Sequence, residues 1–464
     1  MKDATAQTRT DRYPGDTYED ILERDSRPVP DHLREKEVRS LGTEPIKVSR
    51  YFDPEFFQQE VDHVWSRVWQ WACLEDDIPN VGDHQVYDNV GRSLIITRTG
   101  PDKIRAFYNS CLHRGRQLVT EPGCKTEFRC PYHGITWNTD GSLKENPIAW
   151  DFPQLQGRDM SLPEARVERW AGFVFVNFDQ NAKPLMHHMG PIAEHFERYD
   201  WRSRYKAVHV QKVVRANWKV TAEAFMEANH VITTHPQLQP YLADVNSQYD
   251  FLNDYVSRNL VAMGVPSPLV ADRYTDDDVV RAYAAQGGSR RAVDNASGPA
   301  VPDGASTRTV CADMVRRGLA LEDGWDYSEC SDAEMVDSLV YNLWPNLSFW
   351  AGYAPSLVYR WRPNGLDPST SIMDLVLMKR APKSGARPSP APIRHLGPDD
   401  RWADAPELGP RFGGVFDQDE GNLPYMERGM RSSRSGVVYF GRYTEMRIRQ
   451  MHKLIDEYIA AGTA

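Results

Sequence analysis

The sequence predicts an α+β protein in which a β-rich part precedes a part of mixed character. Between about residues 80 and 178, short segments rich in β-branched and aromatic residues alternate with turn signals, as in Ser93–Arg98 and Ala171–Phe178. Beyond about residue 181, strand-like and helix-like segments are mixed. A chain of 464 residues has room for two or three domains.

The other segments are assigned from their own patterns. Residues 1–45 are polar and charged with little periodicity, and we expect a mobile arm that packs on a neighbouring subunit. Residues 54–71 carry apolar side chains at helical spacing, and the Gly-, Ala- and Ser-rich residues 284–308 predict an exposed loop. The remaining expected elements are strands at Ile104–Tyr108, Val208–Val214, Ser338–Trp350, Ser356–Arg362 and Thr370–Met378, and helices at Trp218–Ile232 and residues 444–460.

The composition excludes several classes of protein. Lys plus Arg number 55 and Asp plus Glu 65, for a net charge of −10 without a dense basic run, so nucleic acid is not an expected partner. Six scattered cysteines in so long a chain favour a reducing compartment over a disulfide framework. The sequence shows no signal peptide and no membrane-spanning apolar run, so we expect a cytoplasmic protein with no membrane association. It also lacks the glycine-rich loops that hold NADH, flavin or ATP.

Two short stretches carry the strongest chemical signal. C-L-H at residues 111–113 and C-P-Y-H at residues 130–133 each offer one thiolate and one imidazole. Two thiolates and two imidazoles are the ligand set of a Rieske 2Fe–2S cluster, which transfers single electrons. Structural zinc is the alternative, but zinc modules usually pair Cys with Cys and His with His. We therefore predict a cluster held at turns between strands by Cys111, His113, Cys130 and His133.

A cluster that transfers electrons needs an acceptor, and His230 with His235 is the best candidate. Two His and one carboxylate bind non-haem Fe(II) and leave positions open for O2. Positions i and i+5 of an α-helix lie about 140° apart, so we expect the helix to end or bulge between the two His. Pro236 favours such an ending.

Spacing alone leaves the third iron ligand open. Glu223 and Glu227 lie near the His pair in the sequence. A dense acidic group, Asp417, Asp419 and Glu420, is a further source, although most such groups are solvated loops.

Taken together, these residues resemble the α-subunit of the Rieske non-haem iron ring-hydroxylating oxygenases. The resemblance covers about residues 50–460 and rests on CLHRG, CPYHGITW, NWK with its downstream Glu and His, and FDQDEGNLPYMERGMRS. It implies that His230, His235 and Asp419 bind the iron. It also implies that Glu227 hydrogen-bonds a cluster His of the adjacent subunit, which would be His133, and so bridges the two metal sites for electron transfer.

The resemblance further implies a fold and a division into domains. After the polar arm, a helical lead-in and β-rich Rieske domain would occupy residues 46–180, with a core at about 72–180. A catalytic mononuclear iron domain would occupy residues 181–464, with an antiparallel sheet flanked by helices in the helix-grip or START-like manner.

The function implied is that of a terminal oxygenase. It would use O2 and electrons from NAD(P)H, delivered by a separate reductase and possibly a ferredoxin, to cis-dihydroxylate an aromatic or other largely apolar substrate. The alternative is a monooxygenase or demethylase acting on a non-arene substrate, and the rival of another class is a pure electron carrier. Electron transfer between subunits predicts a trimer, α3 or α3β3. The side chains expected to line the pocket are Met226, Phe251, Leu252, Leu343, Trp344, Phe349 and Trp350.

Overall fold

The protein consists of two compact units. The computed structural model describes residues 13–287, 298–353 and 356–463. The smaller unit comprises Gln58–His187, Pro363–Asp367 and Tyr458–Ala464. The larger unit comprises Met1–Phe57, His188–Arg362 and Pro368–Glu457, so the N-terminal segment belongs to it.

The smaller unit is built almost entirely from antiparallel strands. A seven-stranded sheet has the order β2-β11-β10-β5-β4-β3-β6, and a three-stranded sheet has the order β7-β8-β9. Its strands are β2 (Gln70–Leu74), β3 (Asp83–Asn89), β4 (Arg92–Gly100), β5 (Lys103–Tyr108), β6 (Gly123–Cys124), β7 (Glu127–Arg129), β8 (Thr136–Asn138), β9 (Leu143–Glu145), β10 (Glu164–Trp170) and β11 (Phe173–Asn177). The expected β-rich part is confirmed.

The larger unit is organised around an eight-stranded sheet of order β13-β14-β15-β16-β17-β18-β12-β19. Neighbouring pairs from β13–β14 to β16–β17, and the pair β12–β18, are antiparallel, while β19 joins β12 in parallel. The strands are β12 (Arg204–Val214), β13 (Gln248–Phe251), β14 (Val256–Val261), β15 (Ser338–Leu343), β16 (Leu347–Trp350), β17 (Leu357–Asn364), β18 (Asp367–Arg380) and β19 (Arg394–Leu396). Two further strands, β1 (Ile46–Lys47) and β20 (Val437–Val438), pair with each other.

Helices accompany the strands, as the α+β prediction requires. The helix α3 continues directly into a π-helical turn, η3 (Glu60–Trp65). The α-helices are α2 (Tyr18–Leu22), α3 (Pro54–Gln59), α4 (Leu185–Met189), α5 (Ile192–Glu197), α6 (Trp218–Glu223), α7 (Val231–Thr234), α8 (Asp276–Gly287), α9 (Thr307–Asp323), α10 (Asp332–Val336), α11 (Gly409–Arg431) and α12 (Met446–Thr463).

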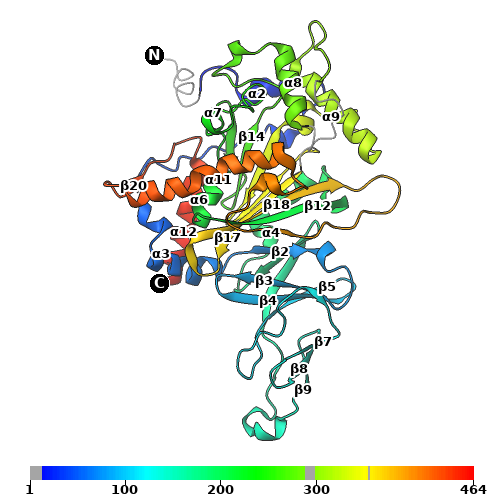
Figure 1. Cartoon of the computed structure of the whole chain (residues 1–464), viewed down its shortest axis with the longest axis vertical. Helices are drawn as coiled ribbons and strands as arrows, with labels where there is room; N and C mark the ends of the chain where they lie inside the picture. The colour runs from blue at the N-terminus through cyan, green and yellow to red at the C-terminus, as the bar shows by residue number, and fades with distance from the viewer. Residues whose placement is uncertain (1–12, 288–297, 354–355, 464) are drawn as a thin grey trace. The chain divides into compact units, whose positions relative to one another are not determined.

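The helix α11 crosses the large sheet in front of β12, β17 and β18 (Figure 1). The Phe416 ring on α11 lies 5.9 Å from the Tyr359 ring on β17, and Glu420 pairs with Lys212 on β12. Residues 417–420 therefore belong to a packed helix and do not form a solvated loop. The buried side chains of α11 recur every three or four residues, at positions 412, 416, 419, 423, 427 and 430, and this packing outweighs its internal Gly and Pro residues.

Two other expectations differ from the structure. The single helix expected at Trp218–Ile232 is interrupted, since α6 ends at Glu223 and α7 begins at Val231. The loop expected at residues 284–308 is shorter, because α8 extends to Gly287 and α9 begins at Thr307. Residues 288–297 of that loop lie outside the described residues.

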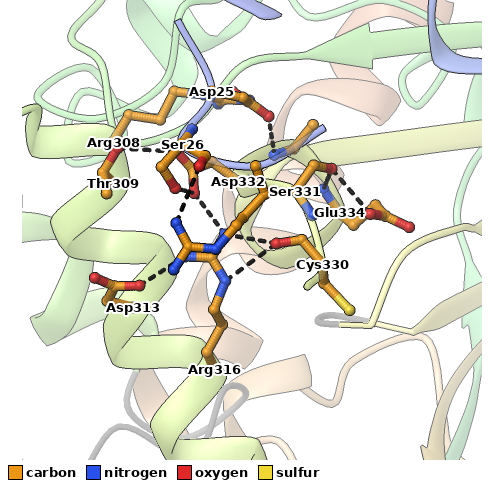
Figure 2. Close-up of polar contacts among 12 residues, drawn as sticks. Asp25, Ser26, Arg308, Thr309, Asp313, Arg316, Cys330, Ser331, Asp332 and Glu334 are labelled. Atoms are coloured by element: carbon orange, nitrogen blue, oxygen red, sulfur yellow. Dashed lines mark hydrogen bonds and ion pairs between the residues drawn. The ribbon is translucent and has the colours of Figure 1, made fainter. Parts of the chain in front are cut away.

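The expectation of a mobile N-terminal arm is wrong for residues 13–45. Tyr18, Ile21 and Leu22 of α2 are buried against the larger unit of the same chain. Figure 2 shows why this polar segment is held: Asp25 and Ser26 lie beside buried charged groups from α9 and α10. Arg308 contacts Asp25 at 2.7 Å, and Ser26 donates to Asp332 at 2.7 Å. Ion pairs and hydrogen bonds hold the segment in place. Hydrophobic periodicity could not predict this, because the contacts are polar.

Candidate metal centres and substrate pocket

The two Cys–His stretches form a matched pair of loops in the smaller unit. One follows β5, and the other is the hairpin tip between β7 and β8. In the first loop Cys111 N–H donates to Arg116 O at 2.8 Å, and Gly115 N–H donates to Cys111 O at 2.9 Å. The second loop repeats this pattern, with Cys130 N–H on Ile135 O at 2.8 Å and Gly134 N–H on Cys130 O at 3.0 Å.

The glycine in each loop is required by the backbone. Gly115 has φ +73° and Gly134 has φ +77°, in the left-handed region that favours glycine. Each loop therefore folds back tightly on itself. The ring centroids of His113 and His133 lie 4.6 Å apart.

The side chains of these loops fit a 2Fe–2S cluster. Cys111 and Cys130 are buried, and Nδ1 of His113 is a buried nitrogen with no hydrogen-bond partner among the described residues. Burial raises the pKa of the Cys111 thiol, while hydrogen bonds from the backbone N–H groups of His113 and Arg114 oppose that rise. Such N–H groups stabilise a cluster-bound thiolate. The two thiols interact with each other and the two imidazole rings lie close together, so the four side chains match the Rieske donor set.

The second candidate centre lies in the larger unit, where His230, His235 and Asp419 converge. One ligand atom from each residue lies within 4.8 Å of the others. The Oδ1 atom of Asp419 is 2.7 Å from Nε2 of His235 and 3.5 Å from Nε2 of His230. His235 and Asp419 are buried and His230 is half-buried.

Local backbone structure brings the two His together. The helix α7 is a single turn, with His230 as its N-cap and His235 as its C-cap. His235 has left the helical region, with φ −125° and ψ 60°, and Pro236 follows it. The expected ending of the helix between the two His is confirmed.

Each His has its outer nitrogen held by an acceptor. Nδ1 of His230 lies 2.6 Å from Oε1 of Glu227, and Nδ1 of His235 lies 2.8 Å from Oε1 of Gln418. Burial lowers the pKa of His230, but the hydrogen bond and charge of Glu227 raise it above its ordinary value overall. With Nδ1 engaged, each ring presents Nε2 toward Asp419, which is the arrangement that metal-binding His adopt.

The other acids considered from the sequence have different partners. Asp417 accepts hydrogen bonds from the backbone N–H groups of Trp402 and Ala403, and Glu420 accepts one from Nε1 of Trp402. Glu223 is buried beside Tyr51 and His452, at 2.9 and 2.8 Å. Asp419 is thus the acid of this group that faces the His pair, and the donor set of two His and one carboxylate fits Fe(II).

A cavity adjoins this centre. It encloses about 890 Å³ of empty space including its open mouth, and His230, His235 and Asp419 are among the residues that line it. The rest of its wall is mostly apolar, with the aromatic side chains of Phe225, Tyr241, Trp350, Tyr359, Phe412 and Phe416. An apolar wall with a few convergent polar groups is typical of small-molecule sites.

Of the seven side chains expected in the pocket, the cavity wall includes only Trp350. The cause is the alternation of side chains along strands. Ser338 and Val340 of β15 face the cavity, so Leu343 faces away. Phe349 lies on the opposite side of β16 from Trp350, and its ring packs 5.6 Å from that of Trp201. The other predicted lining residues, Met226, Phe251, Leu252 and Trp344, do not border this cavity.

Two known protein families match parts of this chain. Residues 196–461 match the family described as "Ring hydroxylating alpha subunit (catalytic domain)", and residues 68–156 match the "Rieske [2Fe-2S] domain". This chain belongs to the ring-hydroxylating oxygenase alpha-subunit family. The family carries a Rieske 2Fe–2S cluster and a mononuclear iron, so both cofactors expected from the sequence are confirmed.

The curated relatives align with less than half of this chain. The large oxygenase component of the naphthalene 1,2-dioxygenase system of Pseudomonas putida is 35% identical over 191 residues, 39% of this chain and 42% of the relative. The carnitine monooxygenase oxygenase subunit of Escherichia coli (strain K12) is 30% identical over 193 residues, 40% of this chain and 50% of the relative. The matched stretch thus spans half or less of either relative.

Solved structures share the fold along most of the chain. A quaternary ammonium Rieske monooxygenase in complex with L-carnitine superposes with a TM-score of 0.62 at 18% identity, covering 89% of this chain and 95% of that one. Naphthalene 1,2-dioxygenase with indole bound superposes with a TM-score of 0.61 at 20% identity, covering 92% and 94%. The predicted fold, a Rieske domain with an antiparallel-sheet catalytic domain, is confirmed. No helix among the described residues is long and apolar enough to cross a membrane.

Proposed function

We propose that this chain is a terminal oxygenase that hydroxylates a largely apolar small molecule. The cluster and the iron, when bound, supply single electrons and the activation of O2. Cys111, His113, Cys130 and His133 would hold the cluster, and His230, His235 and Asp419 would hold the iron.

One observation carries this proposal. The three candidate iron ligands lie in the wall of a cavity whose other lining is mainly apolar and aromatic. A substrate in that cavity would lie beside the iron and away from bulk water. The apolar wall removes water around the reacting carbon and lets the aromatic rings position a flat substrate.

We further propose that the assembly is a trimer, α3 or α3β3, in which Glu227 joins His230 to His133 of a second copy. Glu227 has one carboxylate oxygen on His230 and the other on the backbone N–H of Asn229 and of His230. A carboxylate so fixed orients the His230 ring and has lone pairs left for another His.

Exposed apolar side chains around the cluster loops support a docking surface there. Leu112 and Tyr132, which lie inside the two loops, are 38% and 58% exposed. Trp150 is 80% exposed and lies two residues from Phe152, whose ring is 5.3 Å from that of His113. Contact with a second copy, or with a ferredoxin or reductase that draws electrons from NAD(P)H, would cover this surface.

A complementation experiment tests electron transfer between copies. Chains with Cys130→Ser would lack the cluster, and chains with Asp419→Ala would lack the iron. Neither variant alone should turn over, whereas co-expression should assemble mixed oligomers in which a complete cluster faces a complete iron site. Restored turnover supports the proposal, and inactive mixed oligomers of wild-type size would contradict it.

The reaction itself is tested by product mass after turnover under ¹⁸O2 with a surrogate reductase. Arenes, aryl acids, steroids and methylamines would be offered as a panel. Two labelled oxygens in one product establish cis-dihydroxylation. One labelled oxygen, or the loss of a methyl group as labelled formaldehyde, establishes the monooxygenase or demethylase alternative. Unlabelled products across the panel would contradict oxygenation.

A further inference from the structure

The cavity wall contains two polar side chains that the iron site does not use. Asn259 on β14 and Ser338 on β15 line the cavity, and they are only 5% and 4% exposed. In the register of these strands Asn259 pairs with Val340 and Ser338 pairs with Val261. Asn259 and Ser338 are therefore diagonal neighbours on one face of the sheet, about 7 to 8 Å apart by the usual strand geometry.

Neither side chain has all of its hydrogen-bonding atoms paired within the protein. The Ser338 hydroxyl has no hydrogen-bond partner among the described residues, and the Asn259 amide makes one long contact, from Nδ2 to Gln248 O at 3.4 Å. A buried amide or hydroxyl without a partner carries a desolvation cost. A ligand group that hydrogen-bonds both side chains would remove that cost.

The charges around the cavity restrict what this group can be. Among the described residues that line the cavity there is no Lys or Arg, so no such side chain would pair with a carboxylate on the substrate. The acids in the wall are Glu227 and Asp419, and both already contact a His. The amide and the hydroxyl can each donate and accept, which suits a neutral hydroxyl, carbonyl or amide group.

We infer that the substrate is an uncharged, largely apolar molecule with one neutral hydrogen-bonding group, which binds between Asn259 and Ser338. This inference rests on the proposed function and specifies the substrate class of the same cavity. The polar pair would fix the orientation of the substrate, so that one end meets Asn259 and Ser338 while the apolar body extends toward the iron ligands. Asn259 and Ser338 are then specificity-determining residues.

Equilibrium dialysis of the purified full-length protein, kept free of O2, tests the inference without turnover. The probes share one ring system: naphthalene, 2-naphthol, 2-naphthoate and a trimethylammonium naphthalene. We expect 2-naphthol to bind about three- to ten-fold more tightly than naphthalene, which is the gain of one or two neutral hydrogen bonds. We expect 2-naphthoate to bind most weakly.

Three variants connect that preference to the two side chains. Asn259→Leu and Ser338→Ala should each reduce the ratio of 2-naphthol to naphthalene affinity toward one. The matched control is Val340→Ala, which changes apolar area on the same face and should weaken both probes to a similar extent. Retained visible absorption of the cluster and an unchanged oligomer size would show that the variants are folded.

Several outcomes would overturn the inference. They are an equal affinity for naphthalene and 2-naphthol in the wild-type protein, a preference that survives both polar variants, or tightest binding of either charged probe. Because dialysis measures binding alone, these outcomes differ from a failure of the proposed function. That failure would appear as unlabelled products under ¹⁸O2 even when 2-naphthol binds as expected.

Discussion

Gln418 accepts a hydrogen bond from the ring of His235, with 2.8 Å between Oε1 and Nδ1. Because an amide oxygen can only accept, Nδ1 carries the proton and Nε2 presents its lone pair toward Asp419. Gln418 precedes Asp419 on α11, so one helix supplies both a candidate iron ligand and the group that orients another ligand. Sequence reasoning missed Gln418, although its position within FDQDEGN was a signal.

Replacing Gln418 should therefore weaken iron binding. In Gln418→Ala the His235 ring loses its acceptor, and the affinity for Fe(II) should fall about 10- to 100-fold, as is usual when such outer partners are removed. Iron retained after dialysis against a chelator measures the effect. Asn422→Ala is the matched control, since Asn422 lies one turn further along α11 and is exposed. Equal iron retention in both variants would contradict the role of Gln418.

The acidic residues of α11 should differ sharply in their effect on iron. Asp419→Ala should abolish iron binding while the cluster, which belongs to the other unit, keeps its visible absorption. Asp417→Asn should retain iron, because Asp417 caps the backbone of Trp402 and Ala403. Metal analysis and absorption spectra of both variants provide the check. Iron loss in Asp417→Asn but not in Asp419→Ala would reverse the assignment.

Glu227→Gln should separate metal binding from electron transfer. The amide is close in shape to the carboxylate but lacks its charge and half of its acceptor capacity, so cluster and iron should both stay bound. Reoxidation of the reduced cluster on mixing with O2 and substrate should slow at least about ten-fold. Stopped-flow absorption measures this rate directly. Reoxidation at the wild-type rate would exclude Glu227 as the bridge.

Gly115 should be intolerant of a side chain because of its backbone and not because of crowding. The nearest atom to an added Cβ is Ser110 Oγ at 3.7 Å, but φ is +73°. Gly115→Ala should cost about 1–2 kcal/mol and lower the temperature at which the cluster absorption is lost. Gly100→Ala is the control in the same unit, because Gly100 lacks a positive φ and its added Cβ would lie 3.5 Å from Lys103. A similar loss of stability in both variants would contradict this explanation.

Glu223 should make the larger unit less stable as the pH rises. Burial raises the pKa of Glu223 to about 8, although the hydrogen bond from Tyr51 and the charge of Lys219 act in the opposite direction. The folded state thus keeps a proton that the unfolded state loses near pH 4.5, and the stability from this proton is lost as the pH rises through 8.

Chemical denaturation at pH 7 and at pH 8.5 tests this dependence. The wild-type protein should lose more stability between these values than Glu223→Gln, with an upper limit of about 1.4 kcal/mol per pH unit for one proton. The neighbouring His452 does not interfere, because burial holds its pKa well below the ordinary value and both states are neutral above pH 7. Parallel curves for the two proteins would show that Glu223 is ionised in the folded state.

The sequence by itself determined the features that depend on local spacing. The mixed Cys and His loops, with glycines at positions 115 and 134, identify their ligands from a few adjacent residues. His230 and His235 can approach each other if the helix ends before Pro236. The effect of proline on a helix predicts that ending from the sequence alone. The β-rich part could also be predicted, because alternation and turn signals repeat within short segments.

Only the tertiary structure decided which distant groups meet. The packing of α11 on the sheet decides which of its faces lines the cavity. Asp419 lies on that face and Asp417 does not. Asn259 and Ser338 come together through strand pairing across 79 residues, which no local pattern encodes. Charged side chains of α9 and α10 hold the N-terminal segment. Its polar composition therefore did not indicate that it is partly buried. Long-range packing, and not residue type, selects these partners.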